Sequence, residues 1–167
     1  MRRTLKGPSV TVEEQVRQVE ECVAAFAASV AALDEHLFLT RVTNWTPRDI
    51  VAHLIGWNRH IALGAEQILR GELPFYDVDP GPDYSKVNAA LVRAYPETDR
   101  TALLTSLAAS ARELTVFLRA MNPGGWDRDF GVRHGRETLT VKSTVDDLIA
   151  DYHHHRTQLE EFRGSAV

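Results

Sequence analysis

The feature that most constrains the fold is a row of apolar residues between Val12 and Leu37, spaced four and three positions apart. This spacing places the row on one face of a helix, as in a helix that packs in a bundle. Thr11 and Glu14 have the spacing of a capping box, in which each side chain bonds a free amide at a helix start. We therefore predict a long amphipathic helix that begins after Thr11. The row consists of Val12, Val16, Val19, Val23, Phe26, Val30, Leu33 and Leu37.

A second long helix is predicted from Thr46 to about Arg70. Thr46 is a capping residue, and Pro47 suits the first turn because its missing N–H is not needed there. Gly71 suits the left-handed residue that often follows a helix. The inward face carries Ile50, Leu54, Trp57, Ile61 and Ile68, and Gly56 and Gly64 are small positions where a neighbour can approach closely.

Two more long helices complete the pattern. The third is predicted to begin near Thr98 or Asp99 and to end at Met121, before a proline and two glycines. The last is predicted to begin at Ser143 or Thr144. Four amphipathic segments without a confident strand indicate an all-α fold, a four-helix bundle. The inward face of the last helix carries Val145, Leu148, Tyr152, His155, Leu159 and Phe162.

Long loops are expected after the second and third helices. Residues 72–82 are rich in proline and glycine, and a short helix is predicted over residues 83–94. The second loop covers residues 122–142. Within it, a short hairpin over residues 130–141 is predicted to turn near His134.

Composition narrows the classes of protein further. With 167 residues the chain can bury one core, so residues 1–167 are predicted to form a single domain. The net charge of −4 comes from interspersed acids and bases, so we predict that neither nucleic acid nor a membrane is a partner. No apolar run approaches the roughly 20 residues that span a bilayer, and no signal peptide is recognisable, so a cytoplasmic protein is expected. Cys22 cannot form an internal disulfide and is expected to be buried.

The candidate site begins with Asp151 and His155 on the last helix. These residues are four positions apart, so they lie one turn apart on nearly the same face. A carboxylate and an imidazole at this spacing can bind one metal ion. The alternative is an ordinary ion pair within the helix, which this spacing taken alone favours.

The second helix adds His53, which borders the inward face of that helix. His53, Asp151 and His155 would give three ligands from two helices and leave a position on the metal open for water or substrate. Imidazole and carboxylate suit zinc, nickel or ferrous iron. Trp57, His60 and Tyr152 are candidates for substrate binding, and Asp49, Trp57 and Tyr152 for orienting the site, unless they are core aromatics and a helix-start acid. The catalytic residues themselves stay unassigned.

Two segments resemble a known superfamily. The sequence from Trp45 to Trp57, followed by the sequence from Asp151 to Leu159, resembles the DinB-like metal-binding four-helix bundles. That resemblance implies a metal held by His53, Asp151 and His155. The mycothiol-dependent maleylpyruvate isomerase branch has a glutamate at the position of Asp151. It also carries a C-terminal domain for which this chain has no room, so isomerase activity is not expected.

A second resemblance comes from Leu54 to Arg59 and from the segment that follows Gly71. These stretches are similar to the colibactin self-resistance group, small four-helix proteins that act on an electrophilic cyclopropane and lack the histidine that matches His53. The two resemblances imply different functions for the chain, one with a metal and one without.

These observations leave three hypotheses for the function. The leading hypothesis is a metal-dependent enzyme of thiol-transfer or detoxification type, acting on a small electrophile with a low-molecular-weight thiol as cosubstrate. The second is a metal-independent hydrolase or self-resistance protein for a reactive natural product. The third is a non-catalytic, stress-related binding protein whose buried polar cluster fixes the register of the helices. A homodimer is expected through the alanine-rich faces of the first and third helices.

Overall fold

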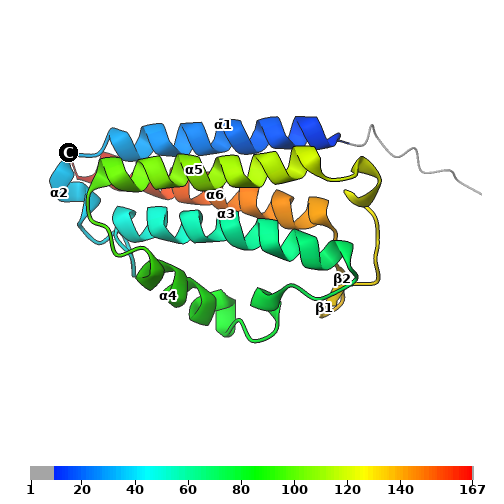
Figure 1. Cartoon of the computed structure of the whole chain (residues 1–167). Coiled ribbons are helices and arrows are strands. Elements are labelled where there is room, and N and C mark those ends of the chain that lie inside the picture. The colour runs from blue at the N-terminus through cyan, green and yellow to red at the C-terminus, as the bar shows by residue number, and fades with distance from the viewer. Residues whose placement is uncertain (1–9, 167) are drawn as a thin grey trace, which may run out of the picture.

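The computed structural model describes residues 10–166, and four long helices lie side by side in it (Figure 1). Their bounds are α1 Val12–Ala31, α3 Pro47–Leu69, α5 Arg100–Ala120 and α6 Val141–Ser165. Helices α1 and α3 each pack against both α5 and α6. The four helices therefore close around a shared core, which confirms the predicted all-α bundle.

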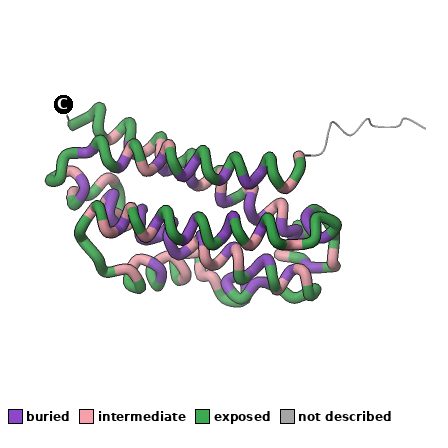
Figure 2. The backbone as a smooth tube through the Cα atoms, turned by 45° about the horizontal axis from the view of Figure 1, so that its top comes forward, coloured by how far each residue is buried: buried purple, intermediate pink, exposed green. Residues whose placement is uncertain are grey.

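The core is formed by the inward faces that the apolar spacing predicts, except that Phe162 near the end of α6 lies outside it (Figure 2). Phe26 on α1 and Tyr152 on α6 meet edge to face, with ring centroids 5.7 Å apart. A polar chain crosses the same region: the Tyr152 hydroxyl donates to Asn58 on α3, and the Asn58 amide donates to Ser110 on α5. These hydrogen bonds join three helices, so they fix the register of the bundle as well as satisfying buried polar groups.

Helix starts follow the capping chemistry of the sequence. The amide of Glu14 bonds the Thr11 hydroxyl, and the Glu14 carboxylate accepts from the Thr11 amide in return. Thr46 and Asp49 make the same reciprocal pair at the start of α3, at 3.2 Å and 3.0 Å. The predicted starts of both helices are confirmed. Gly71 has a φ of +76° directly after α3, as its position predicts.

Two helix bounds differ from the predictions. Helix α1 ends at Ala31, and Leu37 lies in a separate short helix, α2, Glu35–Phe38. The last helix begins at Val141, two residues earlier than the earlier of the two predicted starts, because Thr140 is the cap and Ser143 is its partner inside the first turn. The sequence offers several hydroxyl residues in a row here, and any of them suits a cap.

The connection from α3 to α5 runs along one side of α3. It contains the 3-10 turns η1 Phe75–Asp77 and η2 Pro82–Tyr84, then α4 Ser85–Ala94. Both predicted close approaches are present in this connection. A Cβ at Gly56 would lie 2.5 Å from the Leu91 side chain, and one at Gly64 would lie 2.6 Å from the Tyr76 ring. Two glycines in α3 therefore allow α4 and η1 to lie directly on that helix.

The connection from α5 to α6 contains the 3-10 turn η3 Pro123–Gly125 and the predicted hairpin. Its strands are β1 Arg133–His134 and β2 Glu137–Thr138, paired antiparallel. The hairpin turns through Gly135, which has a φ of +59°. The two long connections meet where the Tyr84 hydroxyl lies 3.3 Å from Nδ1 of His134. They thus enclose the same side of the bundle, between α3 and α6.

Candidate functional site

His53, Asp151 and His155 lie together between α3 and α6. Nε2 of His53 is 2.9 Å from Oδ2 of Asp151, and Nε2 of His155 is 3.4 Å from Oδ1 of the same carboxylate. One ligand atom from each residue lies within 4.8 Å of the other two. The aspartate side chain is therefore long enough to reach both imidazoles from its place one turn before His155.

Aromatic rings surround this cluster. His53 and His155 are 4% and 7% exposed, and their ring centroids are 5.2 Å apart. The Trp45 ring lies 4.9 Å from His53 and 6.2 Å from His155, between centroids. We did not predict Trp45 as part of the site, although its place directly before the cap of α3 brings it to the same end of the helix. Asp151 is the more accessible member, with its side chain 35% exposed.

His155 is oriented by Gln158. The Gln158 amide nitrogen lies 3.4 Å from the Thr43 hydroxyl, and the Gln158 carbonyl oxygen lies 3.1 Å from Nδ1 of His155. This hydrogen bond places a proton on Nδ1 and leaves Nε2 with a free lone pair. We expected Asp49 as an orienting residue; instead it caps α3 and pairs with Arg48.

The second nitrogen of His53 has a different environment. Nδ1 of His53 is buried, and it has no hydrogen-bond partner among residues 10–166. A buried ring nitrogen without a partner costs free energy that a neutral core histidine normally avoids. The polar contact of the His53 ring is therefore the one that its other nitrogen, Nε2, makes with Asp151.

The protonation states follow from burial and from neighbouring groups. Burial opposes ionisation of Asp151, but the hydrogen bond to His53 and the nearby imidazoles outweigh it and lower the pKa of that carboxyl group. Burial lowers the pKa of His155, against the opposing effect of Asp151. Near neutral pH the site thus holds a carboxylate and a neutral imidazole at these positions, the forms in which these residues bind metals.

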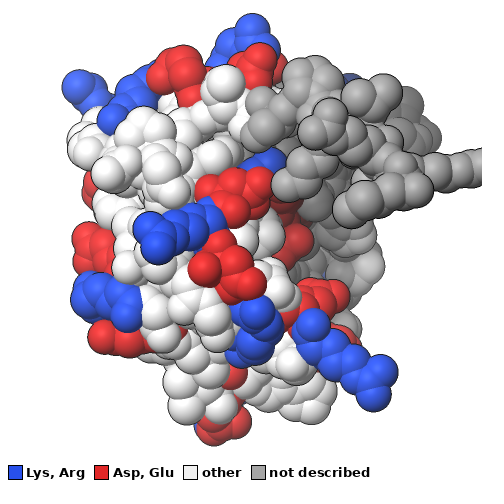
Figure 3. Space-filling model, turned by 90° about the vertical axis from the view of Figure 1, so that its right-hand side faces the viewer, with Lys and Arg blue, Asp and Glu red and all other residues white. Residues whose placement is uncertain are grey.

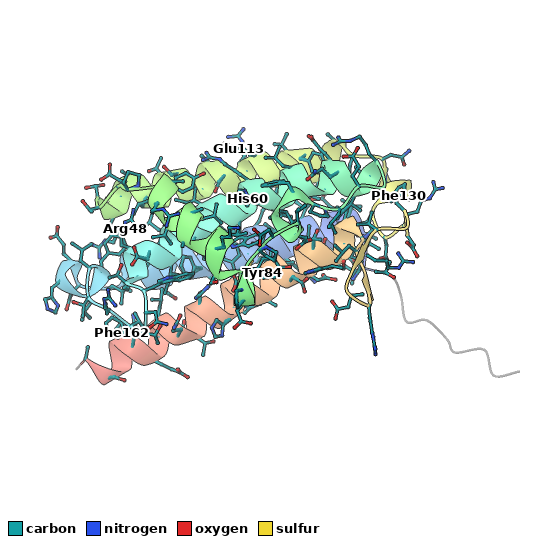
Figure 4. The ribbon with its side chains drawn as sticks, turned by 90° about the horizontal axis from the view of Figure 1, so that it is seen from below. Arg48, His60, Tyr84, Glu113, Phe130 and Phe162 are labelled. Carbon is teal, nitrogen blue, oxygen red and sulfur yellow. The ribbon has the colours of Figure 1, made fainter. Side chains whose placement is uncertain are left out.

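A pocket of about 540 Å³ opens beside the cluster, on the side covered by the two long connections. His53, Asp151 and Trp57 line it, and the indole nitrogen of Trp57 donates to Asn88 of α4 at 2.8 Å. Figure 4 views the molecule from this side, with Tyr84 and His60 labelled. The remaining lining residues are Ile61, Tyr76, Asp77, Asp83, Tyr84, Asn88, His134, Glu137, Leu139, Thr144, Asp147 and Leu148.

The three residues expected to bind substrate occupy different places. Trp57 lines the pocket. His60 lies beside it, with its ring 4.7 Å from Phe75 and 6.0 Å from Tyr76 between centroids, and is not among the described lining residues. Tyr152 is fully buried in the core with its hydroxyl bonded to Asn58. The structure therefore places only the tryptophan of this group where a ligand in the pocket can touch it.

Several lining residues come from the long connections and were not predicted as site residues. Asp77 ends η1, Tyr84 ends η2, and His134 and Glu137 belong to the hairpin. No local spacing in the sequence links them. Their only signal is an aromatic and acidic composition in loops that are too long for simple connections.

Comparison with known proteins decides the family. Residues 16–160 match the family model of the mycothiol maleylpyruvate isomerase N-terminal domain. The chain belongs to this family. The match includes all of α3 and residues 141–160 of α6, and therefore all three residues of the cluster. No curated protein sequence gives a significant match to the chain.

The chain is similar to several solved structures of the same fold. The colibactin self-resistance protein ClbS, crystallised in complex with a dsDNA, is 13% identical, with a TM-score of 0.74 over 93% of this chain and 97% of that one. The protein described as sibling lethal factor precursor, DfsB, is 15% identical, with a TM-score of 0.76 over 95% of this chain and 98% of that one. A Streptococcus pneumoniae protein is 14% identical, with a TM-score of 0.71 over 96% and 94%. At these identities the likeness concerns the fold.

The prediction that nucleic acid is excluded as a partner, made from the charge pattern, was wrong. A bundle of the same fold is crystallised with a dsDNA, so an interspersed charge pattern does not exclude that class of partner. The physical reason is that net charge is a sum over the whole molecule, whereas a DNA contact needs only a local group of basic residues. On the face shown in Figure 3, lysine and arginine side chains stand among the acids. Separately, none of the helices in residues 10–166 combines the length and apolar character needed to cross a membrane.

Proposed function

We propose that His53, Asp151 and His155 bind one divalent metal ion and that the protein is a metal-dependent enzyme of thiol-transfer or detoxification type. The observation that carries the proposal is the convergence of three ligand atoms within 4.8 Å at the wall of a pocket. Two imidazoles and one carboxylate fit zinc, nickel or ferrous iron. Domains of this family are associated with metals.

The surrounding residues suit such a centre. A bound ion with an open position lowers the pKa of a thiol or water that joins it. Asp151 supplies the negative charge between the two imidazoles, and Gln158 holds the Nε2 lone pair of His155 toward the cluster. Trp45 covers both rings and keeps bulk water from that side. The pocket beside Trp57 then offers space for a small electrophile.

In the proposed transfer, the thiol sulfur forms a bond to carbon, the bond from that carbon to its leaving group breaks, and the thiol proton is released. The test uses protein loaded with zinc or nickel, a panel of small thiols and an alkyl halide or epoxide, and follows loss of free thiol. We expect a rate above the uncatalysed one that is lost in His53→Ala and kept in His153→Ala. His153 is an exposed histidine of α6, the helix that carries Asp151 and His155, and is the control for loss of a histidine outside the cluster.

No rate above background with any thiol, in protein whose metal content is confirmed, would contradict a thiol transferase. Water would then be tested as the nucleophile by measuring electrophile consumption without thiol. Equal rates in the wild type and His53→Ala would contradict a role for the cluster in either reaction.

The likeness in fold to the colibactin self-resistance protein favours a second candidate. Here the protein would hydrolyse or sequester a reactive natural product without a metal, and would protect DNA from alkylation. Purified protein treated with a chelator is mixed with DNA and an alkylating electrophile, and DNA adducts are counted. Protection that survives chelation supports this candidate, and protection that disappears with the metal supports the first.

A further inference from the structure

The end of the pocket that lies nearer the N-terminus of α6 than the three-residue cluster is acidic. Five carboxylate residues line the pocket, whereas none of its described lining residues is lysine or arginine. Asp147 lies one helical turn before Asp151 on α6, so the two Cα atoms are about 6 Å apart along the helix axis at 1.5 Å per residue. The acids are Asp77, Asp83, Glu137, Asp147 and Asp151.

Asp77 is the most deeply buried of these acids. Its side chain is 3% exposed, and Oδ1 accepts a hydrogen bond of 2.6 Å from the Tyr84 hydroxyl. That hydroxyl also lies 3.3 Å from Nδ1 of His134, which ties η2 to the hairpin. Nδ1 of His134 itself lies 3.7 Å from Oδ1 of Asp77. Both neighbours contact Oδ1, so the buried carboxylate keeps capacity at Oδ2 to accept from a charged donor.

Tyr76 gives an independent indication of a ligand at the same place. It lines the pocket, is 5% exposed, and its hydroxyl has no hydrogen-bond partner among residues 10–166. Burial, and then Asp77, Tyr84 and Asp147, raise the pKa of the Tyr76 hydroxyl. This buried donor and acceptor lies in an acidic environment, and a polar ligand would satisfy it.

The rings around the acids suit a cation as well. Trp57 lies edge to face with Tyr76 and with Tyr84, at centroid distances of 5.1 Å and 5.6 Å. Aromatic rings attract cations through the negative charge of their faces. Burial and the neighbouring acids, Glu137 first among them, raise the pKa of Asp147, which shows the mutual repulsion that a cation would relieve.

A second metal ion is a poor occupant. Within residues 10–166, the group of three ligand atoms that lie within 4.8 Å of one another is His53, Asp151 and His155, and the remaining acids of the pocket form no second group of this kind. Acids that do not converge as three ligands on one ion still suit a cation with several donors, such as an alkylammonium group. Its hydrogen atoms can reach more than one carboxylate.

We propose that this end of the pocket binds the ammonium group of a small amine, with Asp77, Asp147 and the Tyr76 hydroxyl as its partners and Trp57 and Tyr84 beside it. The inference rests on the proposed function only where it treats His53, Asp151 and His155 as a metal site. Combined with that function, it makes the substrate an amine-bearing thiol or electrophile. Its reacting atom would lie about one helical turn from the amine, roughly 6 Å.

The test is calorimetric titration with 2-phenylethylamine and with the uncharged 2-phenylethanol, on metal-free and on zinc-loaded protein. We expect the amine to bind at least about tenfold more tightly than the alcohol, because a hydrogen bond from a charged donor to a carboxylate is stronger than one from a neutral hydroxyl. Asp77→Asn and Asp147→Asn should each reduce that preference several-fold. Asp34→Asn removes the same charge at an exposed position outside the pocket and should leave it unchanged.

Equal binding of amine and alcohol, no binding of either, or an unchanged preference in both pocket variants would overturn the proposal. Asp147 is exposed, so its variant tests the subsite even where Asp77→Asn disturbs folding. The two proposals fail separately. If metal-free protein prefers the amine but does not bind zinc, the amine subsite is supported and the metal centre is contradicted. If the protein binds zinc but shows no preference for the amine, the metal centre is supported and the amine subsite is contradicted.

Discussion

Nε2 of His53 lies 2.9 Å from Oδ2 of Asp151, although the two residues are 98 positions apart in the chain. One belongs to α3 and the other to α6, and the pair joins the two helices where the pocket opens between them. His155 lies one turn farther along α6, with its own ring nitrogen 3.4 Å from the same carboxylate. The bundle therefore assembles one polar cluster from two helices that are each predictable on their own.

Gly64→Ala should lower the free energy of unfolding by about 1–3 kcal/mol, because a well-packed site does not accommodate an added methyl group. The added Cβ would lie 2.6 Å from the Tyr76 ring and would displace it from α3. Urea denaturation measures the change. Gly164→Ala is the control, since nothing lies within 4 Å of a Cβ there, and its stability should be unchanged or slightly higher.

Tyr152→Phe should lower stability by about 1–3 kcal/mol, since it leaves a buried amide oxygen without its donor. The lost bond is the one of 3.0 Å from the Tyr152 hydroxyl to Asn58. Tyr95→Phe removes a hydroxyl that bonds Arg59 in a less buried place and should have a smaller effect. Equal losses in the two variants would show that the chain of hydrogen bonds across the core has no special weight.

Cys22 should resist thiol reagents in the folded protein. Its side chain is buried, and burial raises the pKa of the thiol to about 12, so little thiolate forms even at pH 9. Labelling with an aromatic disulfide reagent should be slow from pH 7 to 9 and should reach completion only in denaturant. Rapid labelling of the native protein at pH 8 would mean that α1 opens readily.

The sequence predicted the helix bundle better than it predicted where each helix begins and ends. Apolar spacing and capping residues are local signals, so they located α1 and α3 well. The end of α1 escaped them because Leu33 and Leu37 continue the apolar spacing while Asp34 starts a new short helix. Whether residues 1–167 form one domain, and whether the protein is a homodimer, stay predictions.

Local sequence patterns likewise predicted one part of the candidate site and missed the other. His53, Asp151 and His155 lie on regular helices, where spacing predicts which side chains share a face. Asp77, Tyr84 and His134 come from loops, and their meeting depends on tertiary contacts that no periodicity encodes. Tyr84 even has a φ of +56°, a backbone conformation that few tyrosines adopt. Sequence patterns therefore indicate the cluster of His53, Asp151 and His155 but not the acidic end of the pocket.

The central claim is that the cluster binds a metal, and elemental analysis by mass spectrometry tests it most directly. Wild type, His155→Ala and the exposed control His153→Ala are purified without a histidine tag and dialysed against metal-free buffer. We predict about one equivalent of zinc, nickel or iron in the wild type and the control, as for a three-ligand site, and none in His155→Ala. A wild type that holds no metal even after reconstitution, or a His155→Ala variant that holds as much as the wild type, would contradict the claim.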